Sequence, residues 1–223
     1  NKFLFIEKKN IDKISKYDLS FINNNYNKIL YLEGHFESEK YFLDYKDLIK
    51  NEFIFNNMKL FQNNNFFKNL TNTNSVAICL RQNRFVEGVN KNTKLNKLKS
   101  WNYTLEQIKY INKCVDIIKS KLNNPKFFLW SNDFKNLNNS MFGFNFDKIS
   151  LNNVNPDIDK RFLSLFLLTK AKHFITTPST FNWWGAWLSE NKNKLIFRPS
   201  KSAFKNFSVN NLDFWPDSWF SID

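Results

Sequence analysis

Short apolar runs alternate with longer helix-like segments along most of this chain, and this alternation limits the fold more than any other feature. Strand-type runs are expected at 3–6, 28–32, 76–80, 127–130, 146–151, 173–177 and 194–198. Helices are expected at 38–50, 57–69, 104–122, 157–171 and 180–190. Strands that alternate with helices form right-handed βαβ units, so the pattern predicts an α/β fold with a Rossmann-type parallel sheet and helices on both faces.

Polar segments follow three of the predicted strands, at 81–84, 131–133 and 177–180. Ligands of open parallel sheets bind outside the carboxyl ends of the strands, so we expect a site where these segments meet. The lysine-rich stretch 86–100 is expected to be an irregular loop. It is either a solvated connection or a lid that contributes to acceptor binding.

The segment 173–188 predicts a buried strand, a turn with hydroxyl groups and an aromatic-rich helix. The free N–H groups at the start of that helix, together with Ser179 and Thr180, could hold a phosphate. Alternatively, Ser179 or Thr180 only caps the helix. The turn has no glycine-rich loop, so it is not a P-loop. Trp183 and Trp187 share one helical face and Trp184 points elsewhere, so at least two of the three rings are expected in the core.

Arg81 comes directly after a predicted strand and should project from the carboxyl edge of the sheet. Its guanidinium can grip phosphate oxygens with two parallel hydrogen bonds. Asn132 and Asp133 follow the next strand and could bind a purine edge or a ribose hydroxyl, or they could cap a helix. With Ser179 and Thr180, these groups predict a metal-free site for a nucleotide diphosphate.

The net charge of +13 is a weak argument for nucleic-acid binding. Of the 33 basic residues 29 are lysines, and Asn and Phe are abundant beside them. These residue types share A/T-rich codons, so genome composition explains much of the charge. Basic residues are also scattered instead of forming a compact patch. We therefore expect no nucleic-acid partner, and an anionic membrane surface or a phosphorylated sugar is an equally good use of the charge.

Cysteine, histidine and hydropathy patterns exclude several other classes. Cys79 and Cys114 lie in different predicted elements, which does not support a disulfide framework. The two histidines, His35 and His173, lack partners at metal-ligand spacing, so no metal site is predicted. No apolar run is long enough to span a bilayer and no signal peptide is evident. A cytoplasmic location is expected, with the inner face of the membrane left open.

Four segments fall in the order of one known family. They are 36–42 (FESEKYF), 76–85 (VAICLRQNRF), 128–133 (FLWSND) and 173–188, which includes 179–188 (STFNWWGAWL). The chain resembles glycosyltransferase family 11, the galactoside α-1,2-fucosyltransferases, whose typical pieces read GYFQSEKYF, HIRRGDY, FSDD and SxFSWWGAWL. The likeness spans nearly all of the chain. The family's opening GGLGNQ segment is absent, so we expect an N-terminally truncated member whose first lobe is incomplete.

The resemblance implies a GT-B-like fold of two Rossmann-type lobes. Residues 1–70 would be the remnant of the acceptor-side lobe, and 71–223 the donor-binding domain. It implies inverting, metal-independent transfer of L-fucose from GDP-fucose to a galactoside hydroxyl of an oligosaccharide or glycolipid. Arg81 would be catalytic, gripping the departing diphosphate. The expected donor-binding residues are Arg81, Asn132, Asp133, Ser179, Thr180 and Phe181.

Departures from the family pattern keep other readings open. In the HIRRGDY segment only Arg81 keeps its identity, whereas Cys79, Gln82 and Arg84 replace the family's His, Arg and Asp. A transferase with another donor or linkage is therefore an alternative, and so is a non-catalytic module that binds glycans or polyanions. The general base stays unassigned. It is either one of four residues near predicted strand ends, Glu37, Glu39, Glu87 and His35, or a residue of the absent N-terminal segment.

Overall fold

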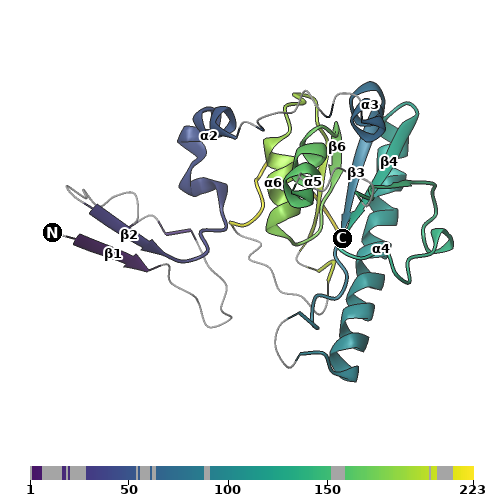
Figure 1. Cartoon of the computed structure of the whole chain (residues 1–223), viewed down its shortest axis with the longest axis horizontal. Coiled ribbons are helices and arrows are strands. Elements are labelled where there is room, and N and C mark those ends of the chain that lie inside the picture. The colour runs from purple at the N-terminus through teal and green to yellow at the C-terminus, as the bar shows by residue number, and fades with distance from the viewer. Residues whose placement is uncertain are drawn as a thin grey trace. The chain divides into compact units, whose positions relative to one another are not determined.

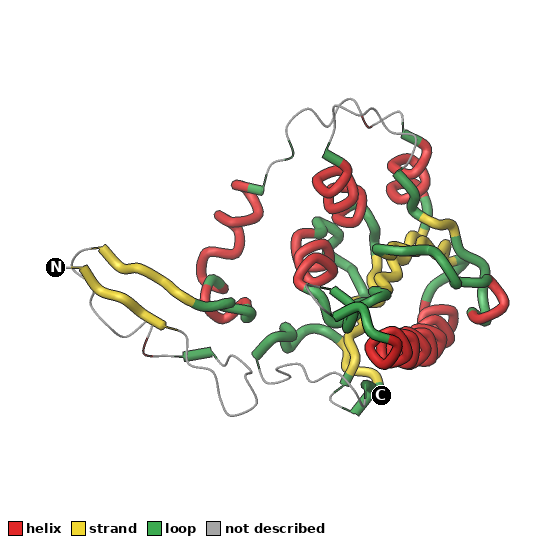
Figure 2. The backbone as a smooth tube through the Cα atoms, turned by 60° about the horizontal axis from the view of Figure 1, so that its bottom comes forward, coloured by secondary structure: helices red, strands yellow, loops and turns green. Residues whose placement is uncertain are grey.

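The computed structural model describes residues 2–6, 17–18, 20, 29–53, 55, 61, 64–87, 91–151, 159–200, 202–204 and 213–223. The chain divides into two compact units (Figures 1 and 2). The smaller comprises Asn1–Glu52 and Ser208–Ser218, and the larger comprises Phe53–Phe207 and Trp219–Asp223. The division expected from the family resemblance, into an acceptor-side remnant at 1–70 and a donor-binding domain at 71–223, stays a prediction.

A parallel strand pair and a short helical segment make up the smaller unit. Strand β1 (Lys2–Ile6) pairs with β2 (Ile29–Glu33). The 3-10 helices η1 (Glu39–Tyr41) and η2 (Leu43–Tyr45) then lead into α2 (Lys46–Glu52). The expectation of one helix over 38–50 was therefore wrong in its first half. Phe42 stands between the 3-10 turns with φ −142° and ψ 16°, which is not a helical conformation.

The segment 36–42 forms contacts that hold this small unit together. Lys40 Nζ lies 2.8 Å from Asp213 Oδ1, and this hydrogen bond is the main reason that the pKa of Lys40 is raised. Asp213 Oδ2 also accepts from the backbone N–H of Tyr17 at 3.1 Å. The Tyr41 ring packs edge-on against both Tyr17 and Phe36, with centroids 5.0 and 5.2 Å away. The segment 36–42, which carries part of the family resemblance, thus stabilises the smaller unit.

A six-stranded sheet organises the larger unit, and all its strands are parallel. Its order is β5-β4-β3-β6-β7-β8. The strands are β3 (Asn74–Leu80), β4 (Pro125–Ser131), β5 (Asp147–Lys148), β6 (His173–Ile175), β7 (Ile196–Pro199) and β8 (Phe220–Ile222). The helices are α3 (Asn65–Asn72), α4 (Lys94–Lys121), α5 (Lys160–Thr169) and α6 (Thr180–Leu188), with a 3-10 turn η4 (Asn139–Met141). The predicted α/β class with a parallel sheet flanked by helices is confirmed.

Strand order places a topological switch point between β3 and β6. From β3 the chain builds outward through β4 and β5, then returns to the other side of β3 and builds through β6, β7 and β8. This is the Rossmann order, in which ligands bind in the crevice where the two directions diverge. The turns after β3 and β6 therefore border the expected binding crevice.

Helices cover both faces of this sheet (Figures 1 and 2). Alternate residues of β3 point to opposite faces. Val76 and Ile78 belong to a buried cluster with Ile111 and Cys114 of α4. On the opposite face lie α3, α5 and α6, and Phe67 of α3 stacks on a ring of α5 with centroids 5.8 Å apart. Both faces of the central strand are therefore covered, which accounts for the unbroken burial of residues 75–80.

Two further sequence expectations differ from the structure. The stretch 86–100 is not irregular throughout, because α4 begins at Lys94 after Thr93, whose side chain caps the Asn96 N–H at 3.2 Å. The high lysine content of 86–100 did not indicate where α4 begins, since solvated loops have a similar composition. Of 88–90 nothing is described. Strand β8 was not predicted, because its residues are largely exposed and lack an apolar run.

Tight packing of α6 against α5 explains the small residue within the tryptophan segment. A Cβ on Gly185 would overlap Leu168 Cδ2 and lie 2.5 Å from Leu168 Cγ. Trp183 and Trp187 are buried, and their rings stack with centroids 5.8 Å apart. Trp184 is half-buried and stacks on Phe53 at 5.4 Å. The prediction that at least two of the three tryptophans lie in the core is confirmed.

Candidate functional site

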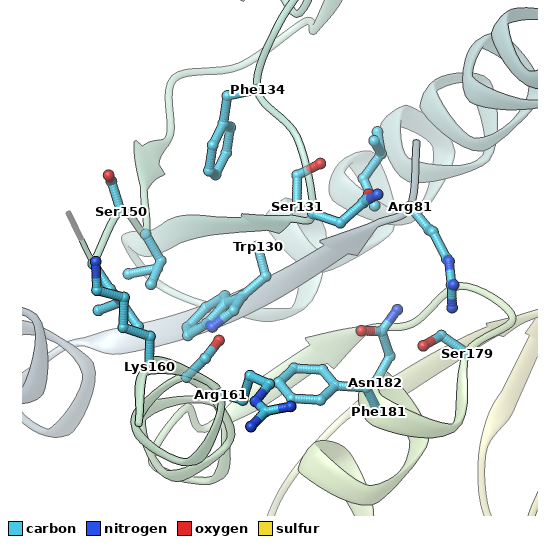
Figure 3. A pocket seen from close by; sticks show the side chains of 15 residues that line it. Arg81, Trp130, Ser131, Phe134, Ser150, Lys160, Arg161, Ser179, Phe181 and Asn182 are labelled. Atoms are coloured by element: carbon cyan, nitrogen blue, oxygen red, sulfur yellow. The ribbon is translucent and has the colours of Figure 1, made fainter. Parts of the chain in front are cut away.

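A cavity of about 600 Å³ lies at the carboxyl edge of the sheet in the larger unit (Figure 3). Its lining comes from the ends of β3 and β4, the residues after β5, and the first turns of α5 and α6. This volume falls in the range of small-molecule pockets, about 300 to 1,000 Å³. The cavity therefore occupies the switch-point position that the strand order assigns to a ligand.

The backbone of Arg81 is held by a buried side-chain amide. Gln107 of α4 is fully buried; its Oε1 accepts from the Arg81 N–H at 3.1 Å, and its Nε2 donates to the Arg81 carbonyl at 2.8 Å. The Gln107 amide thus makes the backbone hydrogen bonds that a neighbouring strand would make if β3 continued to Arg81. Such pairing fixes the direction in which the Arg81 side chain leaves the sheet.

The next residue of the same turn is held in the same manner from the other side. Asn132 Oδ1 accepts from the Gln82 N–H at 2.7 Å, and Asn132 Nδ2 donates to the Gln82 carbonyl at 3.1 Å. Gln82 is buried, and its own amide donates to the carbonyls of Asp133 and Lys135. These bonds tie the turn after β3 to the turn after β4.

Asn83 stands where the family pattern has glycine, and its backbone explains that replacement. Its φ is 58°, in the left-handed region that asparagine tolerates better than other residues with a Cβ. Its side-chain Nδ2 donates to Asp133 Oδ2 at 3.1 Å. Asp133 Oδ1 accepts from the Lys135 N–H at 2.8 Å. The expected donor-binding residues Asn132 and Asp133 therefore organise these two turns, and their contact with a ligand stays a prediction.

The Arg81 side chain lines the cavity and points toward Ser179 and Asn182 (Figure 3). Its Nη2 lies 2.6 Å from Glu87 Oε2, while its buried Nε has no hydrogen-bond partner among the described residues. Glu87 also lies 4.0 Å from Arg84 Nη1. Half-exposed pairs of this kind are worth little energy and can rearrange. The guanidinium is therefore oriented yet keeps donor capacity toward the cavity.

Ser179 and Phe181 line the same cavity from the start of α6, whereas Thr180 is exposed and does not line it. Ser179 occupies the N-cap position, but its side chain makes no capping hydrogen bond. The simple helix-cap reading of Ser179 therefore lacks its expected bond. The first N–H groups of a helix have no partner within the helix and attract anions. Arg81, Ser179 and Phe181 are brought together here, and their proposed roles stay predictions.

Residues missed in the sequence also contribute to the cavity. Asn182 is buried, and its Nδ2 donates to Thr177 Oγ1 at 3.2 Å, which links the helix start to the turn before it. Trp130, near the end of β4, forms part of the cavity wall. Lys160 and Arg161 line it from α5, where Arg161 is tied to the capping carboxylate of Asp159 at 2.7 Å. Only the position of Trp130 at a strand end could have signalled its role.

Other reactive side chains are buried in the core of the larger unit. His173 Nδ1 accepts from the Leu195 N–H at 3.1 Å, and its pKa is lowered by burial and by the nearby Lys172 charge. Burial raises the pKa of the Cys114 thiol to about 12 and that of Cys79 further still. In the described ranges no three His, Cys, Asp or Glu side chains gather as metal ligands would. Within those ranges no helix is long and apolar enough to cross a membrane.

Comparisons with known proteins identify the family of the chain. The model of the family described as "Glycosyl transferase family 11" matches residues 2–222. An α-1,2-colitosyltransferase of Escherichia coli is 27% identical over 197 residues, covering 85% of this chain and 61% of that protein. The O-antigen biosynthesis glycosyltransferase WbnK of Escherichia coli is 36% identical over 62 residues, covering 27% of this chain and 20% of that protein. The chain thus spans about three fifths of the longer-matched relative.

Proposed function

Since the chain belongs to glycosyl transferase family 11, we propose that it transfers L-fucose from GDP-fucose to a galactoside hydroxyl, with inversion and an α-1,2 linkage. The observation that carries the proposal is the meeting of Arg81 and the α6 N-terminus at one switch-point cavity. Both are donors suited to a diphosphate, and they come from turns that lie far apart in sequence. The name of the relative, an α-1,2-colitosyltransferase, supports the linkage.

In the proposed reaction a sugar hydroxyl attacks the anomeric carbon and the nucleoside diphosphate leaves. Negative charge grows on the diphosphate as the glycosidic bond breaks, so preorganised donors help most in the transition state. Arg81 would grip this charge with its free guanidinium N–H groups, and Ser179 with the first amides of α6 would hold the same phosphates. Phe181 would cover them, and Asn132 would border the nucleotide. Thr180 and Asp133 do not line the cavity, and their expected contacts with the donor stay predictions. Metal independence is part of this proposal.

Colitose is the alternative donor sugar, because the longer-matched relative is named for it. It is fucose without one ring hydroxyl, so a site for either sugar keeps the same nucleotide contacts. Together with Cys79, the changed segment 82–84, with Gln, Asn and Arg, separates this chain from the common family pattern.

A donor panel tests the proposed function. The 223-residue chain is titrated calorimetrically with GDP-fucose, GDP-colitose and UDP-galactose, without divalent metal. We expect the GDP sugars to bind at least tenfold more tightly than UDP-galactose, and product analysis with a β-galactoside acceptor identifies the sugar transferred. If GDP-colitose binds more tightly than GDP-fucose, colitose replaces fucose as the proposed donor sugar. Tighter binding of UDP-galactose would contradict the proposal.

Acceptors bound to an anionic membrane are favoured by one surface of the larger unit. Lys91, Lys94 and Lys97 are exposed at the start of α4, and Leu95 and Leu98 beside them are 73% and 57% exposed. No acidic residue lies in the first turn, although the helix dipole favours one there. Each lysine near an anionic bilayer contributes about 1 kcal/mol. Co-sedimentation with phosphatidylglycerol vesicles should therefore exceed that with phosphatidylcholine, and a L95S/L98S variant should lose part of it. Equal sedimentation with both lipids would contradict membrane docking.

A further inference from the structure

Trp130 carries a buried donor that the fold itself does not use. The residue is only 5% exposed, and its indole Nε1–H has no hydrogen-bond partner among the described residues. It stands at the end of β4, one position before the strand's last residue.

An unpaired buried donor is uncommon in native proteins. More than nine tenths of buried polar groups find a partner, because an unpaired one keeps its full desolvation cost. Phenylalanine would fill most of the same space without that cost. The indole N–H therefore indicates an acceptor that arrives with a ligand.

The position of Trp130 in the cavity suggests which part of the ligand it meets. Figure 3 shows Arg81, Ser179 and Asn182 at one end of the cavity and Trp130, Ser150 and Lys160 at the other. The first group suits phosphates. At the second end, Trp130 is joined by the apolar side chains of Ile149, Leu151 and Phe134, which suit a flat ring. A nucleoside diphosphate with its phosphates at Arg81 would direct its base toward Trp130.

We propose that the Trp130 indole N–H donates a hydrogen bond to an acceptor on the nucleobase and thereby contributes to base specificity. The inference rests on the proposed function, because it requires a nucleotide in this cavity. A base that presents a carbonyl oxygen or ring nitrogen to the indole satisfies the donor. A base that presents an amino group there leaves two donors facing each other, so it is rejected.

The substitution Trp130→Phe tests this proposal, since it removes the N–H and keeps most of the ring. Calorimetric titration of the 223-residue chain uses two probes, GDP and inorganic pyrophosphate, in buffer without divalent metal. We expect the GDP dissociation constant to rise about tenfold, as for loss of one hydrogen bond. Pyrophosphate binding should stay within twofold, and the melting temperature without ligand should not fall. Trp183→Phe is the matched control, because Trp183 is equally buried and does not line the cavity.

Each other outcome has a distinct meaning. Unchanged GDP affinity in Trp130→Phe overturns the inference, and so does an equal loss for GDP and pyrophosphate, which would make Trp130 a general wall of the cavity. If the wild-type chain binds neither probe, the proposed function fails instead. If the variant does not fold, the Trp130 indole ¹H–¹⁵N signal of the wild type decides. It should shift with GDP but not with pyrophosphate, and an unmoved signal overturns the inference.

Discussion

The two turns that border the cavity are held in place by different physical means. The turn after β3 is fixed by polar clamps, because Gln107 and Asn132 each satisfy both backbone groups of one turn residue. The turn after β6 has the Asn182–Thr177 side-chain hydrogen bond, but it depends mainly on apolar packing, since α6 is anchored through buried Trp183 and Trp187. The difference teaches that one binding edge can depend on directional hydrogen bonds on one side and on close packing on the other.

Removal of an anchoring ring should have the largest effect on stability. Trp187→Ala deletes a side chain that is 3% exposed and stacked on Trp183. We expect the free energy of unfolding to fall by about 3 to 5 kcal/mol, as for other large truncations in cores. Denaturant unfolding followed by circular dichroism measures it. Trp184→Ala is the control, because Trp184 is half-buried and should cost less; equal losses would contradict the packing account of α6.

Overpacking the contact between α5 and α6 should have the next largest effect. Gly185→Ala places a methyl group against Leu168, which is fully buried and has little room to move. We expect a loss of about 1 to 3 kcal/mol in the free energy of unfolding. Gly185→Ala should cost less in a Leu168→Ala background than in the wild type, because the shortened side chain leaves room for the added methyl group. A neutral Gly185→Ala would show that the helices approach less closely than described.

The polar clamp formed by Gln107 should affect both stability and ligand affinity. Gln107→Met keeps the length of the side chain and removes its hydrogen bonds to Arg81. We expect about 1 to 2 kcal/mol of destabilisation from the unpaired backbone groups, and about a tenfold weaker affinity for inorganic pyrophosphate because Arg81 is no longer oriented. Gln107→Glu keeps the acceptor for the Arg81 N–H and should restore part of the affinity. Unaltered pyrophosphate binding in Gln107→Met would leave Gln107 a purely structural residue.

Acidification should lower the free energy of unfolding by a smaller amount, through His173 at the start of β6. The pKa of His173 is lowered mainly by burial, so the unfolded chain binds a proton more readily than the native chain. Its contribution to stability is therefore complete above the unfolded pKa of about 6.5 and is lost as the pH falls below it. Urea unfolding between neutral and mildly acidic pH should show this loss, and His173→Asn should flatten the profile in that interval. An identical pH profile in both proteins would assign the loss elsewhere.

The sequence was sufficient for five of the six strands of the larger sheet and for the position of their carboxyl ends, because strand periodicity and strand ends are local features. Arg81 and Ser179 could be expected at one edge for this reason. The clamp by Gln107 could not, since it depends on the register between α4 and the end of β3. The unpaired Trp130 donor was equally hidden, because whether an indole N–H has a partner is decided by tertiary packing. Why asparagine stands at position 83 in place of the family's glycine could be explained only from its positive φ, which the sequence does not give.

Thermal unfolding of the 223-residue chain with GDP or guanosine, in the presence of a chelator, tests the central claim most directly. The claim is that Arg81 and the start of α6 together hold a diphosphate without metal. GDP at about 100 times its dissociation constant should add about 2.7 kcal/mol of stability. Guanosine should add much less, and Arg81→Lys should reduce the GDP effect because lysine lacks the two-pronged geometry. Protection that is equal for GDP and guanosine, or that appears only with a divalent cation, would contradict the account.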